Sequence, residues 1–178
     1  MNFSIQPKLE NSNIELIPLQ ENDFERLYEV GSDPAVWANH PNTNRYKVDV
    51  FKNFFEGALE SGGAYLIFCK NTGEIAGSTR FYDYDESQNS IFIGYTFYAV
   101  KFWGKGLNHQ AKTLMLDYIF QFVNKVIFHV GATNYRSQKA MEKLGAIKTD
   151  EIVVAYFGEP DRLNFQYEIL KEDWLNFK

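Results

Sequence analysis

Hydrophobic and polar positions along the chain fall into blocks whose period changes from that of a strand to that of a helix and back. Near the start, "NIELIPL" (13–19) alternates with a two-residue period, which predicts a first strand. Residues 21–31 and 48–60 instead repeat apolar side chains every three to four positions. This spacing predicts two helices, the first of which ends at Gly31.

The next part of the chain favours strands. "AYLIFCK" (64–70) and "EIAGSTRFYDY" (74–84) are separated by "NTG", which predicts two strands joined by a tight hairpin turn. "SIFIGYTFYAV" (90–100) follows after a short polar stretch and predicts another strand. Three adjacent strands with short turns indicate an antiparallel meander.

A strong helical pattern begins at residue 107 and is followed by a strand at 125–132, a helix at 134–145 and two strands at 152–157 and 163–170. The helix that begins at residue 107 is predicted to have an apolar face of two rows, Leu107, Ala111, Leu114 and Tyr118 beside Met115, Ile119 and Phe122. A strand–helix–strand unit needs a crossover connection, so the strands on either side of this helix should be parallel neighbours. We therefore expect an α/β fold with a mixed sheet and packed helices.

Composition supports one soluble domain. The 178 residues are 45% hydrophobic and 17% aromatic, and no repeat, low-complexity tract or linker interrupts them, so we expect a single domain over residues 1–178 with about the first 12 residues frayed. The one cysteine, Cys69, excludes an internal disulfide and is expected to be a packing residue. No signal peptide or membrane span is evident, which favours a cytoplasmic protein. The three histidines show no metal-ligand spacing, and His129 is expected to be structural.

Charge is distributed unevenly along the chain. Residues 101–148 hold eight Lys or Arg against two acidic residues, whereas the remainder holds ten against twenty-one, for a total of −5. This division suggests two binding surfaces that prefer ligands of opposite charge, although charged side chains on solvated faces would give the same counts. Nucleic acid is disfavoured as a partner because the chain has no Arg-rich run and no recognised binding motif.

The basic stretch "KFWGKGLNHQAK" (101–112) lies between a predicted strand and a predicted helix. The first N–H groups of a helix attract anions, and Gly104 and Gly106 would let the backbone approach a pyrophosphate. The stretch is neither a P-loop nor a dinucleotide fingerprint, since His109 stands where the third glycine would be. An ordinary loop remains an alternative on these residues alone.

The wider context resembles a known family. "GYTFYAVKFWGKGLNHQAK" followed by "ATNYRSQKAMEKLGA" resembles the GNAT superfamily of acetyl-coenzyme A dependent N-acetyltransferases. It looks most like the RimJ/RimL-type branch, which acetylates protein N-terminal amines. The resemblance rests on an ordered set, the W-G-x-G turn at 103–106, N-x-x-S at 134–137 and K-L-G at 143–145, and extends from about residue 14 to the end of the chain.

The resemblance implies a central antiparallel meander with a splayed parallel strand pair that binds acetyl-CoA in the gap. The backbone of Phe97, Tyr98 and Ala99 would meet the pantetheine arm. Asn134 would contact the cofactor while also capping its helix, and Ser137 would lie near the thioester sulfur and assist the leaving thiolate. The pyrophosphate would be held by the segment Trp103, Gly104, Lys105, Gly106, Leu107 and Asn108.

Two positions depart from the family pattern. Phe92 stands where many members have a glutamate base, and Met141 stands where many have a tyrosine acid. An α-amine has a pKa near ~8 and a lysine amine near ~10.4, so weak base assistance favours an α-amine acceptor. Asp83, Asp85 or Glu86 through water, or Tyr156 near the acyl site, could take the proton.

We therefore expect an N-acetyltransferase in which the amine attacks the thioester directly, with backbone donors at Phe97 and Tyr98 polarising the carbonyl. Arg80, on a strand facing the cleft, would orient the substrate or pair with an acidic neighbour, and Asp83 would also contact the substrate. A catalytically weak acyl-CoA-binding module, a small-molecule amine acceptor and a nucleic-acid binder remain as alternatives. No metal and no membrane contact are expected, and the protein would be a monomer or homodimer.

Overall fold

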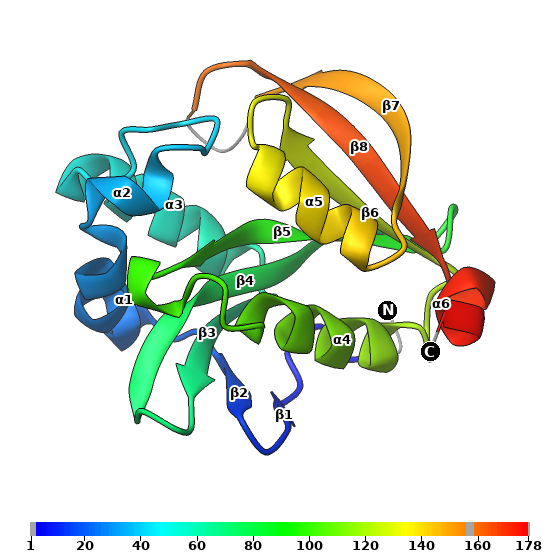
Figure 1. Ribbon diagram of the computed structural model, residues 1–178, viewed down its shortest axis with the longest axis horizontal. Coiled ribbons are helices and arrows are strands. Elements are labelled where there is room, and N and C mark those ends of the chain that lie inside the picture. Colours follow the sequence, from blue (N-terminus) through cyan, green and yellow to red (C-terminus); the bar gives the residue numbers. More distant parts are fainter. Residues whose placement is uncertain (1–2, 156–158, 178) are drawn as a thin grey trace.

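The computed structural model of the protein describes residues 3–155 and 159–177. Eight strands form one mixed sheet in the order β1-β2-β3-β4-β5-β6-β8-β7, and the predicted α/β architecture is confirmed (Figure 1). The strands are β1 (Leu9–Glu10), β2 (Ile14–Pro18), β3 (Ala64–Cys69), β4 (Glu74–Asp85), β5 (Ser90–Tyr98), β6 (Lys125–Gly131), β7 (Ile147–Val154) and β8 (Arg162–Leu170). The helices are α1 (Phe24–Gly31), α2 (Pro34–Trp37), α3 (Val48–Glu60), α4 (Leu107–Ile119), α5 (Tyr135–Lys143) and α6 (Lys171–Phe177), with 3₁₀ turns η1 (Glu21–Asp23) and η2 (Val100–Phe102).

Strand pairing follows the predicted order in the centre of the sheet. β3, β4 and β5 form the expected antiparallel meander. β5 and β6 are parallel and are connected through α4, as the crossover argument requires. β7 begins at Ile147, earlier than the predicted start at residue 152. The polar residues "KTD" after Ile147 belong to an exposed edge strand, so they carry no apolar pattern.

The first residues of the chain are attached to the body of the fold. β1 pairs with β2, the side-chain amide of Gln6 donates to the backbone oxygen of Ala64 at 2.7 Å, and the Tyr118 hydroxyl donates to the backbone oxygen of Ser4 at 2.6 Å. β1 has only two residues, which is too short for a periodic signal in the sequence.

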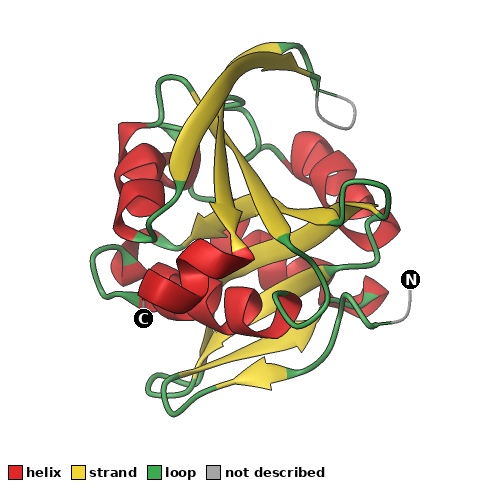
Figure 2. Ribbon diagram, turned by 90° about the vertical axis from the view of Figure 1, so that its right-hand side faces the viewer, coloured by secondary structure: helices red, strands yellow, loops and turns green. Residues whose placement is uncertain are grey.

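Helices cover both faces of the sheet (Figure 2). One apolar cluster joins α1, α2 and α3 to one face and includes Trp37, Phe51, Phe54 and Phe97. A second, larger cluster joins α4 and α5 to the opposite face and includes Phe81, Ile93, Met115 and Phe128. Two neighbouring residues of β5, Phe97 and Tyr98, therefore belong to opposite clusters, as strand alternation requires.

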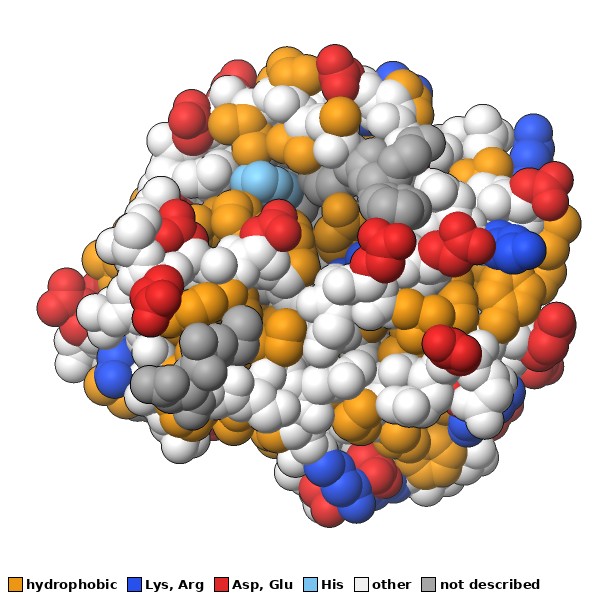
Figure 3. Space-filling view, turned by 180° about the vertical axis from the view of Figure 1, so that it is seen from behind, with side chains coloured by type: hydrophobic (Ala, Val, Ile, Leu, Met, Phe, Trp, Pro, Cys, Tyr) orange, Lys and Arg blue, Asp and Glu red, His pale blue; other side chains and the backbone are white. Residues whose placement is uncertain are grey.

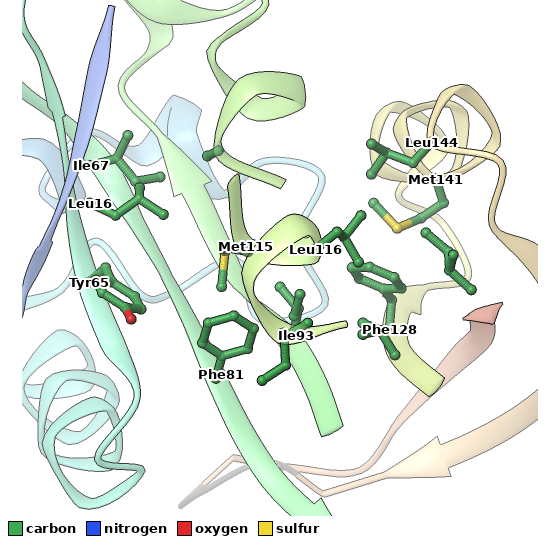
Figure 4. Packing of buried hydrophobic residues seen from close by; sticks show 14 of the residues in the cluster. Leu16, Tyr65, Ile67, Phe81, Ile93, Met115, Leu116, Phe128, Met141 and Leu144 are labelled. Carbon is green, nitrogen blue, oxygen red and sulfur yellow. The ribbon is translucent and has the colours of Figure 1, made fainter. Parts of the chain in front are cut away.

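The buried side of α4 is rotated from the predicted one. Its buried residues are Leu107, Ala111, Lys112, Met115, Leu116 and Ile119, whereas Phe122, beyond the end of the helix, is 38% exposed. Figure 4 shows Leu116 directed toward Phe128 and Met141, which places this side of α4 against β6 and α5. A lysine thus occupies a position in the apolar stripe of the helix.

Candidate active site

The parallel strands β5 and β6 separate along their length. They pair only at Ser90–Lys125, Ile91–Val126 and Phe92–Ile127, although β5 continues to Tyr98 and β6 to Gly131. Beyond Phe92, β5 bonds to β4 on its other edge and β6 bonds to β8. The two facing edges therefore offer backbone donors and acceptors to an extended ligand, as the resemblance implied.

An irregularity in β5 accompanies the separation. Tyr95 has a φ of +52°, an unusual conformation for a residue with a side chain, and the register between β4 and β5 shifts between Ser78 and Arg80. The irregularity places Tyr95 against α3, where its ring centroid lies 6.0 Å from that of Phe54, while Thr96 faces α4.

A cleft of about 490 Å³ opens where the strands separate, between the ends of α4 and α5. It is called the β5–β6 cleft here. Most residues predicted to bind the cofactor line it, namely Phe97, Tyr98, Trp103, Gly104, Gly106, Leu107, Asn108, Asn134 and Ser137. Ala99 and Lys105 are not among the lining residues, and the Ala99 amide instead donates to Ala76 at 2.8 Å.

The glycine turn before α4 is open to the cleft. Gly104 and Gly106 have φ values of +74° and +75°, which favour glycine, and a Cβ atom at either position would meet nothing within 4 Å. The Trp103 indole closes the turn by donating to the backbone oxygen of Tyr98 at 2.9 Å, and the guanidinium of Arg136 lies 3.7 Å from the indole centroid. The start of a helix leaves its first N–H groups without intrahelical partners, so the start of α4 beside this open space and the Arg136 guanidinium is suited to phosphate.

Two buried polar atoms of the cleft lining have no hydrogen-bond partner in the part of the chain that the structure describes. They are the Tyr98 hydroxyl and the Asn108 Oδ1 atom. Unsatisfied buried polar atoms are rare in folded proteins and point to a ligand with complementary groups. An acyl-CoA, with amides along its pantetheine arm and phosphates at the other end, fits this wall of the cleft.

The start of α5 forms the opposite wall. Asn134 is buried, and its Oδ1 atom accepts from the Ser137 amide at 3.2 Å, so the predicted helix cap is confirmed. Ser137 lies half-buried in the same wall. Met141, one turn further along α5, is 4% exposed and lines the inner part of the cleft, and its thioether has no dissociable proton.

On the other face of β5, aromatic side chains surround the position of the missing glutamate. The Phe92 ring centroid lies 5.2 Å from that of Tyr82 and 4.8 Å from that of His129. The His129 Nε2 atom lies 3.4 Å from the Gln166 side-chain oxygen, and in the tautomer that donates from Nε2 to this oxygen, Nδ1 is the nitrogen that accepts a proton. Burial lowers the pKa of His129, which favours the neutral imidazole.

Arg80 lies near this face but is directed away from the cleft. Its guanidinium donates to the backbone oxygens of Gly57 at 2.7 Å and Phe54 at 3.3 Å, and its carbon atom lies 3.7 Å from the Tyr95 ring centroid. Arg80 is 4% exposed, and its contacts connect α3 with β4 and β5. Asp83 is exposed outside the cleft lining, and Tyr156 lies outside the described residues.

Several lining residues have no predicted role in the site, among them His40, Arg45 and Lys112. His40 and Arg45 lie in the segment between α2 and α3, and Arg45 forms a buried, two-pronged ion pair with Glu159 at 2.6 and 2.7 Å. Burial, together with the charges of Arg45 and Arg136, lowers the pKa of His40. Lys112 reaches the sheet from α4, and a lysine within the apolar stripe was the one signal that could have identified it.

The two faces of the site differ in charge. Among the described residues that line the cleft there is no carboxylate, and the cationic side chains are Arg45, Lys112, Arg136, Lys139 and Lys143. On the face opposite α4 and α5, several acidic side chains surround an apolar area that contains a histidine side chain (Figure 3). The uneven charge distribution along the sequence thus corresponds to two regions of the molecule that differ in charge.

The described part of the chain contains no cluster of three or more His, Cys, Asp or Glu side chains that could hold a metal ion. In the same residues, no helix is long and apolar enough to cross a membrane.

Comparisons with known proteins agree with this geometry. A structure described provisionally as an acetyltransferase has a TM-score of 0.79 and 25% identity, covering 95% of this chain and 89% of its own. A GCN5-related N-acetyltransferase from Brucella melitensis has a TM-score of 0.81 and 17% identity, covering 98% and 85%. A spermidine N-acetyltransferase from Vibrio cholerae, in complex with CoA and spermine, has a TM-score of 0.71 and 17% identity, covering 93% and 100%.

No curated protein sequence matches the chain. Residues 13–147 match the family profile described as "Acetyltransferase (GNAT) domain". This range includes the glycine turn, the separated strands and the capped helix that form the cleft. The chain therefore belongs to the GNAT family of acetyltransferases.

Proposed function

We propose that this N-acetyltransferase transfers the acetyl group of acetyl-CoA to the N-terminal α-amine of a protein or peptide, by direct attack in a ternary complex. The observation that carries the choice of acceptor is the absence of a carboxylate from the described cleft lining, with Phe92 at the position of the usual base. Roughly a tenth of an α-amine with a pKa near ~8 is neutral at pH 7, against less than about 0.1% of a lysine amine.

The residues of the cleft have distinct roles in this proposal. Acetyl-CoA supplies the activated thioester, the amides at the start of α4 hold its pyrophosphate, and backbone donors at Phe97 and Tyr98 polarise the carbonyl. Neutral His129, beside Phe92, accepts the proton that the amine loses. Ser137 donates a hydrogen bond to the departing sulfur.

The acidic face would attract the positively charged end of a peptide. A polyamine is less well suited, because its further charges would meet the cationic cleft lining. A ribosomal-protein substrate, as in the RimJ/RimL-type branch, is one member of the proposed class.

The first test is calorimetric titration with acetyl-CoA of the parent and of Gly104→Trp, whose side chain would fill the open space beside the turn. We expect Kd values in the micromolar range for the parent and no binding by the variant. A folded parent that binds no acetyl-CoA would overturn the proposed use of the cleft.

The second test compares three acceptors by mass spectrometry. They are a peptide with a free N-terminus, the same peptide N-terminally blocked but containing a lysine, and spermidine. We expect acetylation of the first at least about tenfold faster than of the others, since the fractions of neutral amine differ by more than that. Preference for spermidine or for the lysine would contradict the proposed acceptor.

A further inference from the structure

Lys112 is an unusual residue for the buried side of a helix. It is 2% exposed and follows Ala111 on α4, with Met115 and Leu116 one turn further along the same side. Lysine is almost never fully buried without an anionic partner. The residue also contributes to the wall of the β5–β6 cleft.

The Lys112 amine is held by two hydroxyl groups and by no carboxylate. Its Nζ atom lies 2.9 Å from the Thr79 Oγ1 atom on β4 and 2.6 Å from the Thr96 Oγ1 atom on β5. The Thr96 hydroxyl is itself placed to donate to the backbone oxygen of Gly94 at 3.3 Å, so its oxygen accepts from the lysine. An ammonium group has three hydrogens, and the threonines use two of them.

Burial makes the charged form of this lysine unfavourable. Desolvation alone lowers the pKa of Lys112 to about 7, and no neighbouring charge contributes. The other ionisable groups of this part of the cleft are Tyr98 on β5, His109 on α4 and Arg136, Lys139 and Lys143 on α5. An amine with this pKa can release its proton near neutral pH, which an ordinary surface lysine does not do.

Lys112 lies on the face of the sheet where the family's usual tyrosine acid is missing. Thr96 follows Tyr95, the residue with positive φ beyond the point where β5 separates from β6, so the lysine nitrogen lies over β4 and β5 on the α4 face, next to that separation. α5, on the same face of the sheet, carries Met141 at the position of the usual tyrosine acid. Lys112 and Met141 both line the cleft on this face of the sheet. Lys112 has a dissociable proton, whereas Met141 has none.

We propose that Lys112 is the general acid that protonates the sulfur of coenzyme A when the thioester bond breaks, an inference that rests on the proposed acetyl transfer. The amine nitrogen bonds to the carbonyl carbon, the carbon–sulfur bond breaks, and its electron pair remains on sulfur. The sulfur takes a proton from the Lys112 Nζ atom, which becomes a neutral amine. The proton lost by the acceptor amine passes to His129 and then to solvent, and Lys112 regains a proton from solvent.

The first readout needs no ligand. Nuclear magnetic resonance titration of ¹³C-labelled lysine side chains gives the pKa of each lysine, with Lys112→Met identifying the resonance of Lys112. We expect that resonance to titrate near pH 7. Titration near 10.5, the ordinary value, would overturn the proposal.

The second readout is the pH dependence of kcat. In the parent, we expect kcat to rise as His129 loses its proton and to fall as Lys112 loses its own near pH 7. Lys112→Met should lower kcat by about 10²-fold, as removal of a general acid does, and should abolish the alkaline fall. Lys139→Met is the matched control, because it removes an exposed cation from the same cleft and should keep the alkaline fall.

The outcomes separate the two proposals. A parent that binds acetyl-CoA and acetylates an amine, but whose Lys112→Met variant keeps kcat within about twofold or keeps the alkaline fall, would overturn the role of Lys112 alone. A lower kcat with an unchanged pH profile would show that Lys112 only positions β5, and would also overturn it. A parent without turnover on any amine would contradict the proposed function itself.

Discussion

Arg80 and Lys112 are two buried cations on opposite faces of the same irregularity in β5. Arg80 is 4% exposed and contacts Tyr95 on the face of α3, and Lys112 is 2% exposed and contacts Thr96 on the face of α4. The guanidinium donates to two backbone oxygens and lies against two aromatic rings, whereas the ammonium reaches two hydroxyl groups and the cleft.

Arg80 and Lys112 differ in what their hydrogen-bond partners would lose if the cation were removed. Without Arg80, the oxygens of Gly57 and Phe54 would lose a buried charged donor. Without Lys112, the hydroxyls of Thr79 and Thr96, which are 2.8 Å apart, could still bond to each other. Burial alone therefore does not distinguish a structural cation from a functional one, but the chemistry of its partners does.

The largest expected effect is on stability, from Arg80→Met. The variant removes a buried charged donor from two backbone oxygens, of which that of Gly57 still accepts from the Ser61 amide at 3.3 Å, and it removes the contact with the Tyr95 ring. We therefore expect a loss of about 2–4 kcal/mol in the free energy of unfolding. Urea denaturation measures this loss. The affinity of the folded fraction for acetyl-CoA should be unchanged. A variant that keeps its stability but loses binding would show that Arg80 has a role in the binding site.

Lys112→Met should change stability in the opposite direction. Because the pKa of Lys112 in the folded protein is about 7 and that of the unfolded chain is near 10.5, the unfolded chain binds more protons between these values. The parent should therefore gain up to about 1.4 kcal/mol per pH unit from this group as pH rises through that window.

The variant lacks this dependence and should be more stable than the parent by about 1–2 kcal/mol below about pH 6, where the buried charge is almost fully present. Denaturation of both proteins at several pH values tests the prediction. A variant that is less stable than the parent at every pH would place Lys112 in the same class as Arg80.

Tyr95→Leu should have a smaller effect, limited to the Arg80 side. The guanidinium carbon lies 3.7 Å from the Tyr95 ring centroid, and loss of this cation–π contact should lower the free energy of unfolding by about 1 kcal/mol. The Lys112 resonance should not move. A shift of that resonance would show that the two cations are coupled through the strand.

Thr96→Val gives the smallest effect and acts only on the Lys112 side. The variant removes a hydroxyl that accepts from the ammonium at 2.6 Å, so the charged form becomes less favourable and the alkaline fall of kcat should move to lower pH. A rate profile over pH measures the shift. An unmoved profile would indicate that the hydroxyl does not contribute to the protonation of Lys112.

The sequence predicted the parts of the site that depend on local pattern. The glycine turn, the Asn134 cap and the parallel pair β5–β6 follow from spacing and from the resemblance, and the structure confirms their geometry. Ser137, Asn134 and most of the predicted cofactor segment meet in one cleft. Their roles toward the cofactor remain predictions.

The parts that sequence reasoning missed depend on contacts between distant residues. Arg80 is bonded to α3, which lies more than 20 positions earlier in the chain, and nothing local to β4 indicates that its donors are already used. The predicted apolar face of α4 extends toward Tyr118 and Phe122, so the pattern does not indicate that Lys112 is buried. The rotation of a helix about its axis is set by the surfaces against which it packs, and these were unknown.

The short parallel pairing of β5 and β6 has a consequence for the lifetime of the protein. In the described part of the chain, three residue pairs of β5 and β6 join the halves of the sheet, so an acyl donor that bound between these strands would complete the sheet as an additional element. Ligands that bind only the folded form add to its stability, by about 1.4 kcal/mol for each tenfold rise in concentration above Kd. The resistance of this enzyme to unfolding and proteolysis should therefore follow the supply of acetyl-CoA, which links its abundance to the metabolic state around it.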